Sequence, residues 1–128
     1  MLSLQVKREE LAWAAGFFDG EGNTSYKETN GDYRTPSLHI HVANTYLPVL
    51  ERFLLAVGGL GKIYTMKKEN PNWKTAWQFS IGRFEYAQAI IALMWEFLSD
   101  EKRDQAREAF RRYHDRQRCW RVMAGVRF

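Results

Sequence analysis

The stretch that decides the fold lies at residues 11–22 and reads Leu11-Ala12-Trp13-Ala14-Ala15-Gly16-Phe17-Phe18-Asp19-Gly20-Glu21-Gly22. Its residue types favour a helix over residues 7–19, and four short side chains share one face of that helix: Ala12, Ala15, Gly16 and Asp19. A glycine inside a helix costs about 1 kcal/mol relative to alanine, so Gly16 indicates close packing against another backbone. Because the stripe is short, its natural partner is the same helix of a second copy in a symmetric dimer.

An acidic pair, Asp19 and Glu21, ends this helix, with Gly20 between the two residues. Carboxylates are disfavoured at the C-terminal end of a helix dipole, so something must offset their charge. A divalent cation would do so, and two Glu21 carboxylates brought together in a dimer would strengthen the need for it. An ordinary surface turn after a buried helix is the alternative that these residues leave open.

Clusters of Gly and Asn divide the rest of the chain into short elements. Alternating apolar and polar residues predict two hairpins, whose strands span residues 23–29, 33–43, 61–68 and 73–81. Helical spacing of apolar residues predicts three further helices, over residues 46–57, 83–98 and 101–116. The order α-β-β-α-β-β-α-α predicts an α+β fold in which a four-stranded antiparallel sheet carries helices on one face and leaves the other face open.

The length of the chain indicates one domain, and its charges indicate that the C-terminal end is basic. The chain has 128 residues, of which 45% are hydrophobic, which is enough for a core. We expect a single domain over residues 1–128, with its core at about 7–116 and a basic tail at 117–128. Residues 1–100 carry 10 basic and 11 acidic side chains, whereas residues 101–128 carry 9 and 4. The positive charge therefore lies in the C-terminal stretch, which could face a polyanion.

One cysteine, Cys119, excludes an intramolecular disulfide and a Cys-rich zinc site, and it fits a reducing compartment. No apolar run approaches the roughly 18 residues of a membrane span. The N-terminal residues 1–10 carry no signal-peptide core. We therefore expect an intracellular protein without a membrane partner, in an organelle or in a prokaryotic or phage-host cytoplasm.

Residues 14–22, Ala-Ala-Gly-Phe-Phe-Asp-Gly-Glu-Gly, resemble the signature of the LAGLIDADG homing endonucleases. The element order predicted over about residues 7–110 is also that of the family's saddle-shaped fold. A single copy of the motif implies a homodimer, because members with two copies are pseudo-symmetric monomers. The chain departs from the common pattern at Ala14, where Leu is usual, and at Glu21, where many members have Asp.

The resemblance implies a site-specific endonuclease that cuts both strands of a long pseudo-palindromic DNA target and leaves short 3′ overhangs. It places the metal on the carboxylate of Glu21 and the carbonyl of Gly20, with Mg²⁺ or Mn²⁺ as cofactor and Ca²⁺ binding without supporting cleavage. The paired motif helices would bring the face with Ala12, Ala15, Gly16 and Asp19 to the two-fold axis. Approximate alignment adds two residues that would support catalysis, Asn44 by positioning water and Lys102 by polarising the site. A helix cap or turn residue for Asn44 and a solvated lysine for Lys102 stay open as alternatives.

The open sheet face is the expected DNA-reading surface, because strands in a major groove can present mixed donors and acceptors to base edges. The residues assigned to it are Asn23, Ser25, Lys27, Thr29, Arg34, Ser37, His39, His41, Lys62, Tyr64, Lys68, Lys74 and Gln78. His39 and His41 point the same way, but two histidines alone rarely hold zinc. Their basic neighbours would contact phosphates and make binding depend on salt.

Two other functions use the same features. A non-cleaving nucleic-acid-binding protein on this scaffold would be an intron RNA maturase, with RNA as partner, or a DNA-binding regulator. A plain dimeric structural module would explain the small-residue helix but would leave the polar sheet face without a role.

Overall fold

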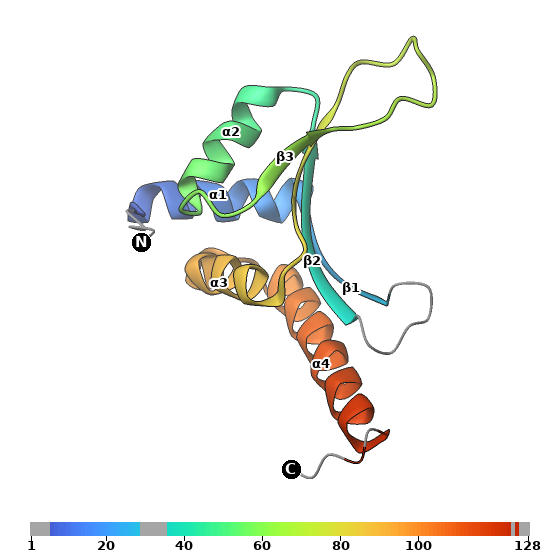
Figure 1. Ribbon diagram of the computed structural model, residues 1–128. Coiled ribbons are helices and arrows are strands. Elements are labelled where there is room, and N and C mark those ends of the chain that lie inside the picture. Colours follow the sequence, from blue (N-terminus) through green and yellow to red (C-terminus); the bar gives the residue numbers. More distant parts are fainter. Residues whose placement is uncertain (1–5, 29–35, 124, 126–128) are drawn as a thin grey trace.

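Helix α1 (Arg8–Glu21) runs directly into strand β1 (Gly22–Glu28) with no loop between them. The computed structural model describes residues 6–28, 36–123 and 125. Its remaining elements are β2 (Pro36–Asn44), α2 (Leu47–Ala56), β3 (Lys62–Thr65), β4 (Trp77–Ile81), α3 (Phe84–Met94), the short 3-10 helix η1 (Trp95–Phe97) and α4 (Asp100–Met123). The predicted order α-β-β-α-β-β-α-α is confirmed (Figure 1).

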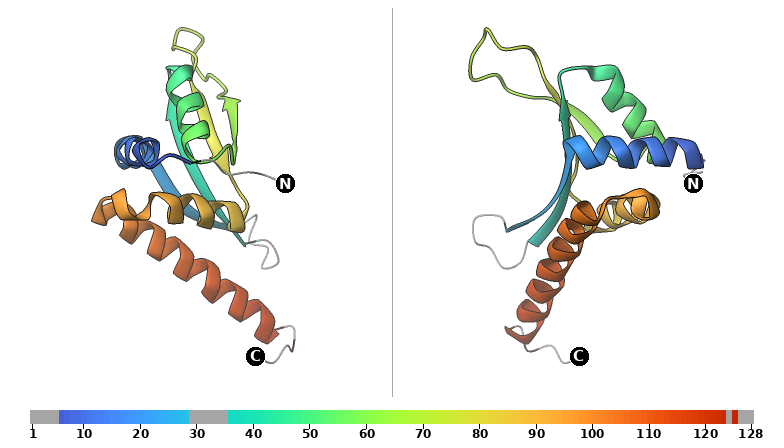
Figure 2. Two further views of the ribbon diagram at one scale, coloured as in Figure 1. Left: turned by 90° about the vertical axis from the view of Figure 1, so that its left-hand side faces the viewer. Right: turned by 180° about the vertical axis from the view of Figure 1, so that it is seen from behind.

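The four strands form one antiparallel sheet in the order β1-β2-β4-β3. Gly22 pairs with Val42, Ile40 with Ile81, and Ile63 with Phe79. The helices cover one face of the sheet, and the strands bend away from them, so the other face is open and concave (Figures 1 and 2). The α+β class and the one-sided placement of the helices are confirmed.

The core lies between the sheet and the helices. Strand β2 buries Leu38, Ile40 and Val42 completely, as its alternation predicts. From the helices, the rings of Phe18 and Phe53 stack at a centroid distance of 6.3 Å, and Phe53 meets Phe79 of β4 edge-on at 5.0 Å. Edge-to-face and offset aromatic pairs add to the free energy of area burial. This aromatic cluster fixes α1 and α2 against the sheet.

The second hairpin is shorter than predicted. Residues 66–76, here called the arm, leave the strand pattern and project from the open side of the sheet (Figure 1). The Met66 N–H donates to the Ala76 carbonyl at 2.9 Å, and the Asn72 N–H donates to Asn70 Oδ1 at 2.9 Å. Asn70 accepts from two N–H groups of the turn, those of Asn72 and Trp73, so residues 70–73 form the tip of the arm. Lys68 and Lys74 therefore lie in the arm and not on strands, which corrects their predicted placement.

The first and last helices are both longer than predicted. Helix α1 continues past residue 19 to Glu21, so Glu21 is helical. Helix α4 continues past residue 116 to Met123, and Gly125 has a φ of 76°, a conformation typical of helix ends. No helix in the described part of the chain is long and apolar enough to cross a membrane.

Candidate active site and nucleic-acid interface

The junction of α1 and β1 holds the end of the motif at the surface. A Cβ atom on Gly22 would lie 2.2 Å from Cδ2 of Phe18, whose ring is fully buried. Only glycine therefore lets the chain turn from helix to strand over this ring. The residues just before it, Gly20 and Glu21, are exposed.

Helix α4 brings Lys102 to this junction. The Lys102 Nζ donates to the Gly22 carbonyl at 2.6 Å, next to Glu21 in the chain. Its backbone N–H donates to Ser99 Oγ at 3.3 Å, which fixes the first turn of α4. In the structure Lys102 is thus held at the end of the motif and is not a freely solvated lysine.

The acidic pair has two separate environments. Both carboxylate oxygens of Asp19 accept from the Ser99 N–H, at 3.1 and 3.2 Å, just before α4 begins. A carboxylate at a helix N-terminus is favoured by the helix dipole, so α4 offsets the charge of Asp19. Glu21 has no such partner among the described residues. The dipole of α4 thus offsets the charge of Asp19 without a cation, which corrects the sequence argument that the pair as a whole needs one.

The side of α4 that faces β1 is a row of polar contacts. The Thr24 N–H donates to Gln105 Oε1 at 3.0 Å, Arg112 lies 4.9 Å from the Tyr26 ring centroid, and Arg116 Nε lies 3.1 Å from Glu28 Oε1. These residues follow Lys102 at helical spacing. Because β1 is an edge strand, its outer backbone groups have no strand partner, and two of them, the Gly22 carbonyl and the Thr24 N–H, are instead bonded by Lys102 and Gln105. Sequence reasoning missed Gln105, although its position one turn after Lys102 was the available signal.

Asn44 occupies the end of β2. Its Oδ1 accepts from the Tyr46 N–H at 2.8 Å. This bond lies in the turn that leads into α2. It has the same strand parity as the buried Val42, which places it on the helix-covered face of the sheet. The structure thus shows a turn residue before α2 and not a helix cap, because Tyr46 is the N-cap residue and no side chain caps the helix there.

The exposed stripe of α1 differs from the predicted one. Ala15 is fully buried in the chain's own core, and Asp19 is partly buried against Ser99, whereas Ala12, Gly16 and Gly20 are exposed. A Cβ atom on Gly16 or Gly20 would meet nothing within 4 Å. The exposed stripe therefore has a small residue every fourth position, and Gly20 takes the place assigned to Ala15.

The open sheet face is a grid of polar side chains in which none is acidic. Across the four strands Asn23 pairs with His41, His41 with Ser80, and Ser80 with Lys62. Three further pairs complete the grid: Ser25 with His39, Lys27 with Ser37, and Gln78 with Tyr64. The predicted residues on the described strands are thus brought to one surface. Thr29 and Arg34 lie outside the described residues.

Two histidines occupy the middle of the grid with parallel rings 5.5 Å apart. Ser37 Oγ lies 2.8 Å from His39 Nε2, and the Gln78 amide nitrogen lies against His41 Nδ1. Burial lowers the pKa of both His39 and His41, and the charge of Lys27 lowers both further. Both imidazoles therefore favour the neutral form, which can donate and accept at once.

The basic residues are distributed unevenly. Five arginines of the helices have acidic partners: Arg8 with Glu96, Arg52 with Glu10, Arg107 with Asp104, Arg111 with Glu108, and Arg116 with Glu28. Six described cations of the strands and their connections have no ion pair with any described residue: Lys27, Lys62, Lys67, Lys68, Lys74 and Arg83. Uncompensated positive charge therefore lies on the open face, the arm and the rim of the sheet.

No cluster of three or more His, Cys, Asp or Glu that could hold a metal exists among the residues that the structure describes.

Neither a family model nor a curated protein matches the sequence. Solved structures do match. The homing endonuclease I-CvuI, in complex with a DNA target in the presence of Mg and with the DNA not cleaved, has a TM-score of 0.60 and 21% identity over 78% of this chain. The LAGLIDADG meganuclease I-CpaMI, bound to uncleaved DNA, has a TM-score of 0.66 and 18% identity over 88%.

A third match, the homing endonuclease I-TnaI, has a TM-score of 0.65 and 13% identity over 88% of this chain. This chain spans 62% of the I-CvuI chain, 38% of the I-CpaMI chain and 76% of the I-TnaI chain. At these identities the likeness is one of fold. This chain therefore has the fold of the LAGLIDADG homing endonucleases, the family that its motif resembles.

Proposed function

We propose that the chain is one subunit of a homodimeric, metal-dependent endonuclease that cuts a long pseudo-palindromic DNA target and leaves short 3′ overhangs. Residues 1–128 would act as one domain. The observation that carries the proposal is that three features meet at one place. Exposed Glu21 ends α1, Lys102 holds the next carbonyl at 2.6 Å, and the acid-free open face of the sheet begins at Asn23.

The donors at the end of α1 fit a hard divalent cation. The Glu21 carboxylate and the Gly20 carbonyl are oxygen donors on exposed residues, and Mg²⁺ takes one or two carboxylates together with waters and phosphate oxygens. When bound, Mg²⁺ or Mn²⁺ would supply an activated water and stabilise charge on the leaving 3′ oxygen. We expect Ca²⁺ to bind without supporting cleavage.

The chain's own residues prepare this site in two ways. The ammonium of Lys102, fixed by the Gly22 carbonyl, places positive charge beside the position of a DNA phosphate. Asp19 anchors the start of α4 through Ser99 and so fixes where Lys102 lies. Asn44 keeps its side-chain NH₂ group for a water, because its Oδ1 accepts from Tyr46.

The dimer is supported by glycines that one chain does not explain. Nothing within 4 Å of Gly16 or Gly20 requires the absence of a side chain, yet each glycine lowers helix stability. The approach of a second α1 along Ala12, Gly16 and Gly20 would explain both residues. It would also bring two Glu21 carboxylates and two open sheet faces together on one duplex.

DNA as the partner is supported by the charge distribution. Among the described residues, the cations of the sheet and arm have no ion pair, whereas five arginines of the helices have acidic partners and Arg103, Arg112 and Arg118 of α4 have none. Unpaired cations around a polar concave face suit a phosphate backbone, and the donors and acceptors in the grid suit base edges.

Cleavage of a DNA library in Mg²⁺, compared with excess chelator, tests the proposal. Glu21→Gln should abolish cleavage and leave binding within a few-fold of the unchanged chain. Glu9→Gln, on the exposed first turn of the same helix, is the matched control and should cleave normally. Mapping the cut ends checks the 3′ overhangs. Tight binding of DNA or RNA with no nicking in any divalent metal would select the non-cleaving alternative.

A further inference from the structure

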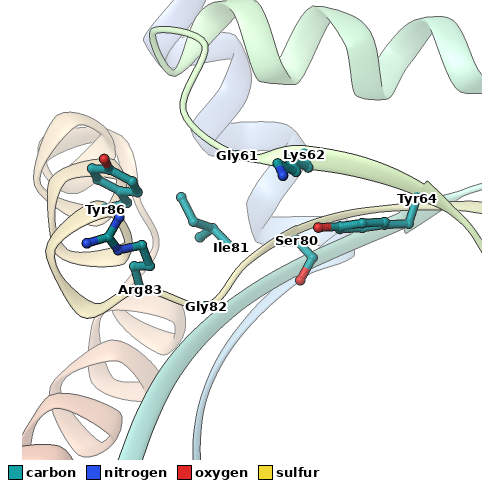
Figure 3. A pocket seen from close by; sticks show the side chains of 8 residues that line it. All are labelled: Gly61, Lys62, Tyr64, Ser80, Ile81, Gly82, Arg83 and Tyr86. Carbon is teal, nitrogen blue, oxygen red and sulfur yellow. The ribbon is translucent and has the colours of Figure 1, made fainter.

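We infer that the hollow between the β3 edge and the start of α3 anchors a backbone phosphate of the bound DNA, held between Lys62 and Arg83. This inference rests on the proposed DNA-binding function. The hollow has a volume of about 240 Å³ and lies where β4 leaves the sheet for α3. Its floor and walls include Ile81, Tyr64 and Tyr86 (Figure 3).

Two cations flank the hollow from different elements. Figure 3 shows Arg83 and Tyr86 on one side of Ile81 and Lys62 on the other. Neither Lys62 nor Arg83 forms an ion pair with any described residue, and no residue lining the hollow is acidic. Arg83 lies 5.1 Å from the centroid of the Tyr86 ring. Stacking of this kind orients a guanidinium and leaves its edge N–H groups free to bind an oxyanion.

The other polar side chains that line the hollow carry hydroxyl groups. Ser80, Tyr64 and Tyr86 each carry one, and Tyr64 and Tyr86 are 55% and 37% exposed, so a ligand can reach them. Two separated cations with neutral hydroxyls beside them, Tyr86 next to Arg83 and both Ser80 and Tyr64 on the Lys62 side of Ile81 (Figure 3), match a singly charged phosphodiester, whose two free oxygens each accept several hydrogen bonds. The N-terminal end of α3 adds partial positive charge on the same side.

The position of the hollow favours DNA over a free phosphate. It shares Lys62, Tyr64 and Ser80 with the polar grid, so a duplex lying on the open face passes its mouth. Lys62 stands in the same row as Asn23 but at the opposite edge of the sheet, three strand spacings or about 14 Å away. The phosphate held here is therefore not the one at Glu21.

A second hollow provides an internal comparison. It lies between β1 and α4, and it also contains arginines, including Arg111 and Arg116. Arg111 is paired with Glu108 and Asp115, and Arg116 with Glu28. Arg112 also lines this hollow and lies against the Tyr26 ring without an ion pair to a described residue, so two of its three arginines have acidic partners, whereas neither Lys62 nor Arg83 has one.

The test is the salt dependence of binding. A duplex recovered by selection from a random pool is titrated with the full-length protein at several salt concentrations. Lys62→Met with Arg83→Met should reduce the slope of log K against log salt by about 1 per lost phosphate contact, or about 2 for a dimer. Arg8→Met with Arg107→Met, which removes two paired cations on helices, is the matched control and should leave the slope unchanged.

A neutral backbone substitution locates the contact. A methylphosphonate placed at successive positions of the duplex should weaken binding by the unchanged protein at one position per half-site, and the double variant should lose that sensitivity. Thermal unfolding checks that the variants fold. If variants with Arg83→Met do not fold, the test is made with Lys62→Met alone. An unchanged slope with unchanged methylphosphonate sensitivity would overturn the anchor.

Two further outcomes separate the possible failures. Submillimolar binding of inorganic phosphate that needs Lys62 and Arg83, with an unchanged DNA salt slope, would assign the hollow to a free phosphate and overturn the inference. Absence of duplex binding by the unchanged protein would overturn the proposed function itself. If Glu21→Gln abolishes cleavage but the salt slope stays the same, only the anchor fails.

Discussion

Gly16 and Gly22 lie six residues apart in one motif, and their surroundings are opposite. A Cβ atom on Gly22 would overlap the buried Phe18 ring, whereas one on Gly16 would meet nothing within 4 Å. We predict that Gly22→Ala destabilises the monomer by about 1–3 kcal/mol through overpacking. Gly16→Ala should stabilise the monomer by about 0.5–1 kcal/mol, because alanine favours the helix. Urea unfolding at a protein concentration low enough for the monomer measures both, and changes of the same sign would contradict the structure.

His39 and His41 give the fold a pH dependence. Burial and then Lys27 lower the pKa of both residues in the folded state, so the unfolded chain binds protons first as pH falls. Their contribution to stability is therefore complete above the unfolded pKa of about 6.5 and is lost below it. We predict that the free energy of unfolding decreases between about pH 7 and 5, and that His39→Asn with His41→Asn flattens this decrease.

The control for the histidine prediction is His114→Asn, on the exposed surface of α4. Denaturant unfolding at several pH values gives the comparison. Equal flattening by the control, or a decrease that survives in the double variant, would exclude the histidine pair as its source.

At the scale of elements, helix α4 ties the C-terminal part of the chain to α1 and β1 in its N-terminal part. Its first turn is tied to Asp19 of α1 through Ser99, and its length follows the free edge of β1. We predict that Asp19→Ala costs about 0.5–2 kcal/mol of stability, because it removes the acceptor at the start of α4. Asp19→Asn should cost less, because its amide oxygen can still accept from the Ser99 N–H.

The two Asp19 variants are compared by chemical denaturation, with Glu9→Ala as the control for loss of a carboxylate on an exposed turn of α1. Hydrogen exchange should show faster opening of the first turn of α4 in Asp19→Ala. If Asp19→Ala is neutral in the monomer and acts only on association, the carboxylate belongs to the dimer and not to α4.

At the scale of the whole molecule, the proposed function requires two copies, because the motif at residues 14–22 occurs once in the chain and the sheet has one open face. We predict that the melting temperature rises with protein concentration, as mass action requires of a dimer. Gly16→Leu should abolish that dependence and give a monomer by sedimentation, because it fills the stripe that the second helix needs. It should also abolish double-strand cleavage, since an isolated chain has a single Glu21.

Ala92→Leu, which adds a similar side chain on the exposed side of α3, is the matched control and should leave association unchanged. A Gly16→Leu protein that still sediments as a stable dimer would place the interface elsewhere. If the melting temperature of the unchanged chain does not depend on protein concentration, the proposed dimer is also contradicted.

The sequence by itself determined the order of elements and the two faces of the sheet. Alternation in Leu38, Ile40 and Val42 has a period of two, and the helices have a period near 3.6, so neighbours along the chain are enough to detect both. The motif at residues 14–22 located the end of α1 to within two residues, since the helix was predicted to end at residue 19 and ends at Glu21. Lys102 was found through resemblance, and its role remains a prediction.

Only the tertiary structure decided which groups meet. Asp19 reaches Ser99 across 80 positions and Thr24 reaches Gln105 across 81, so no local pattern records either bond. Ala15 and Gly20 are small residues of the same motif, but Ala15 is buried and Gly20 is exposed. The way in which α1 packs on the sheet determines this difference. A helical pattern gives the spacing of side chains around the axis, but the rotation of that axis against the core is fixed by packing against distant elements.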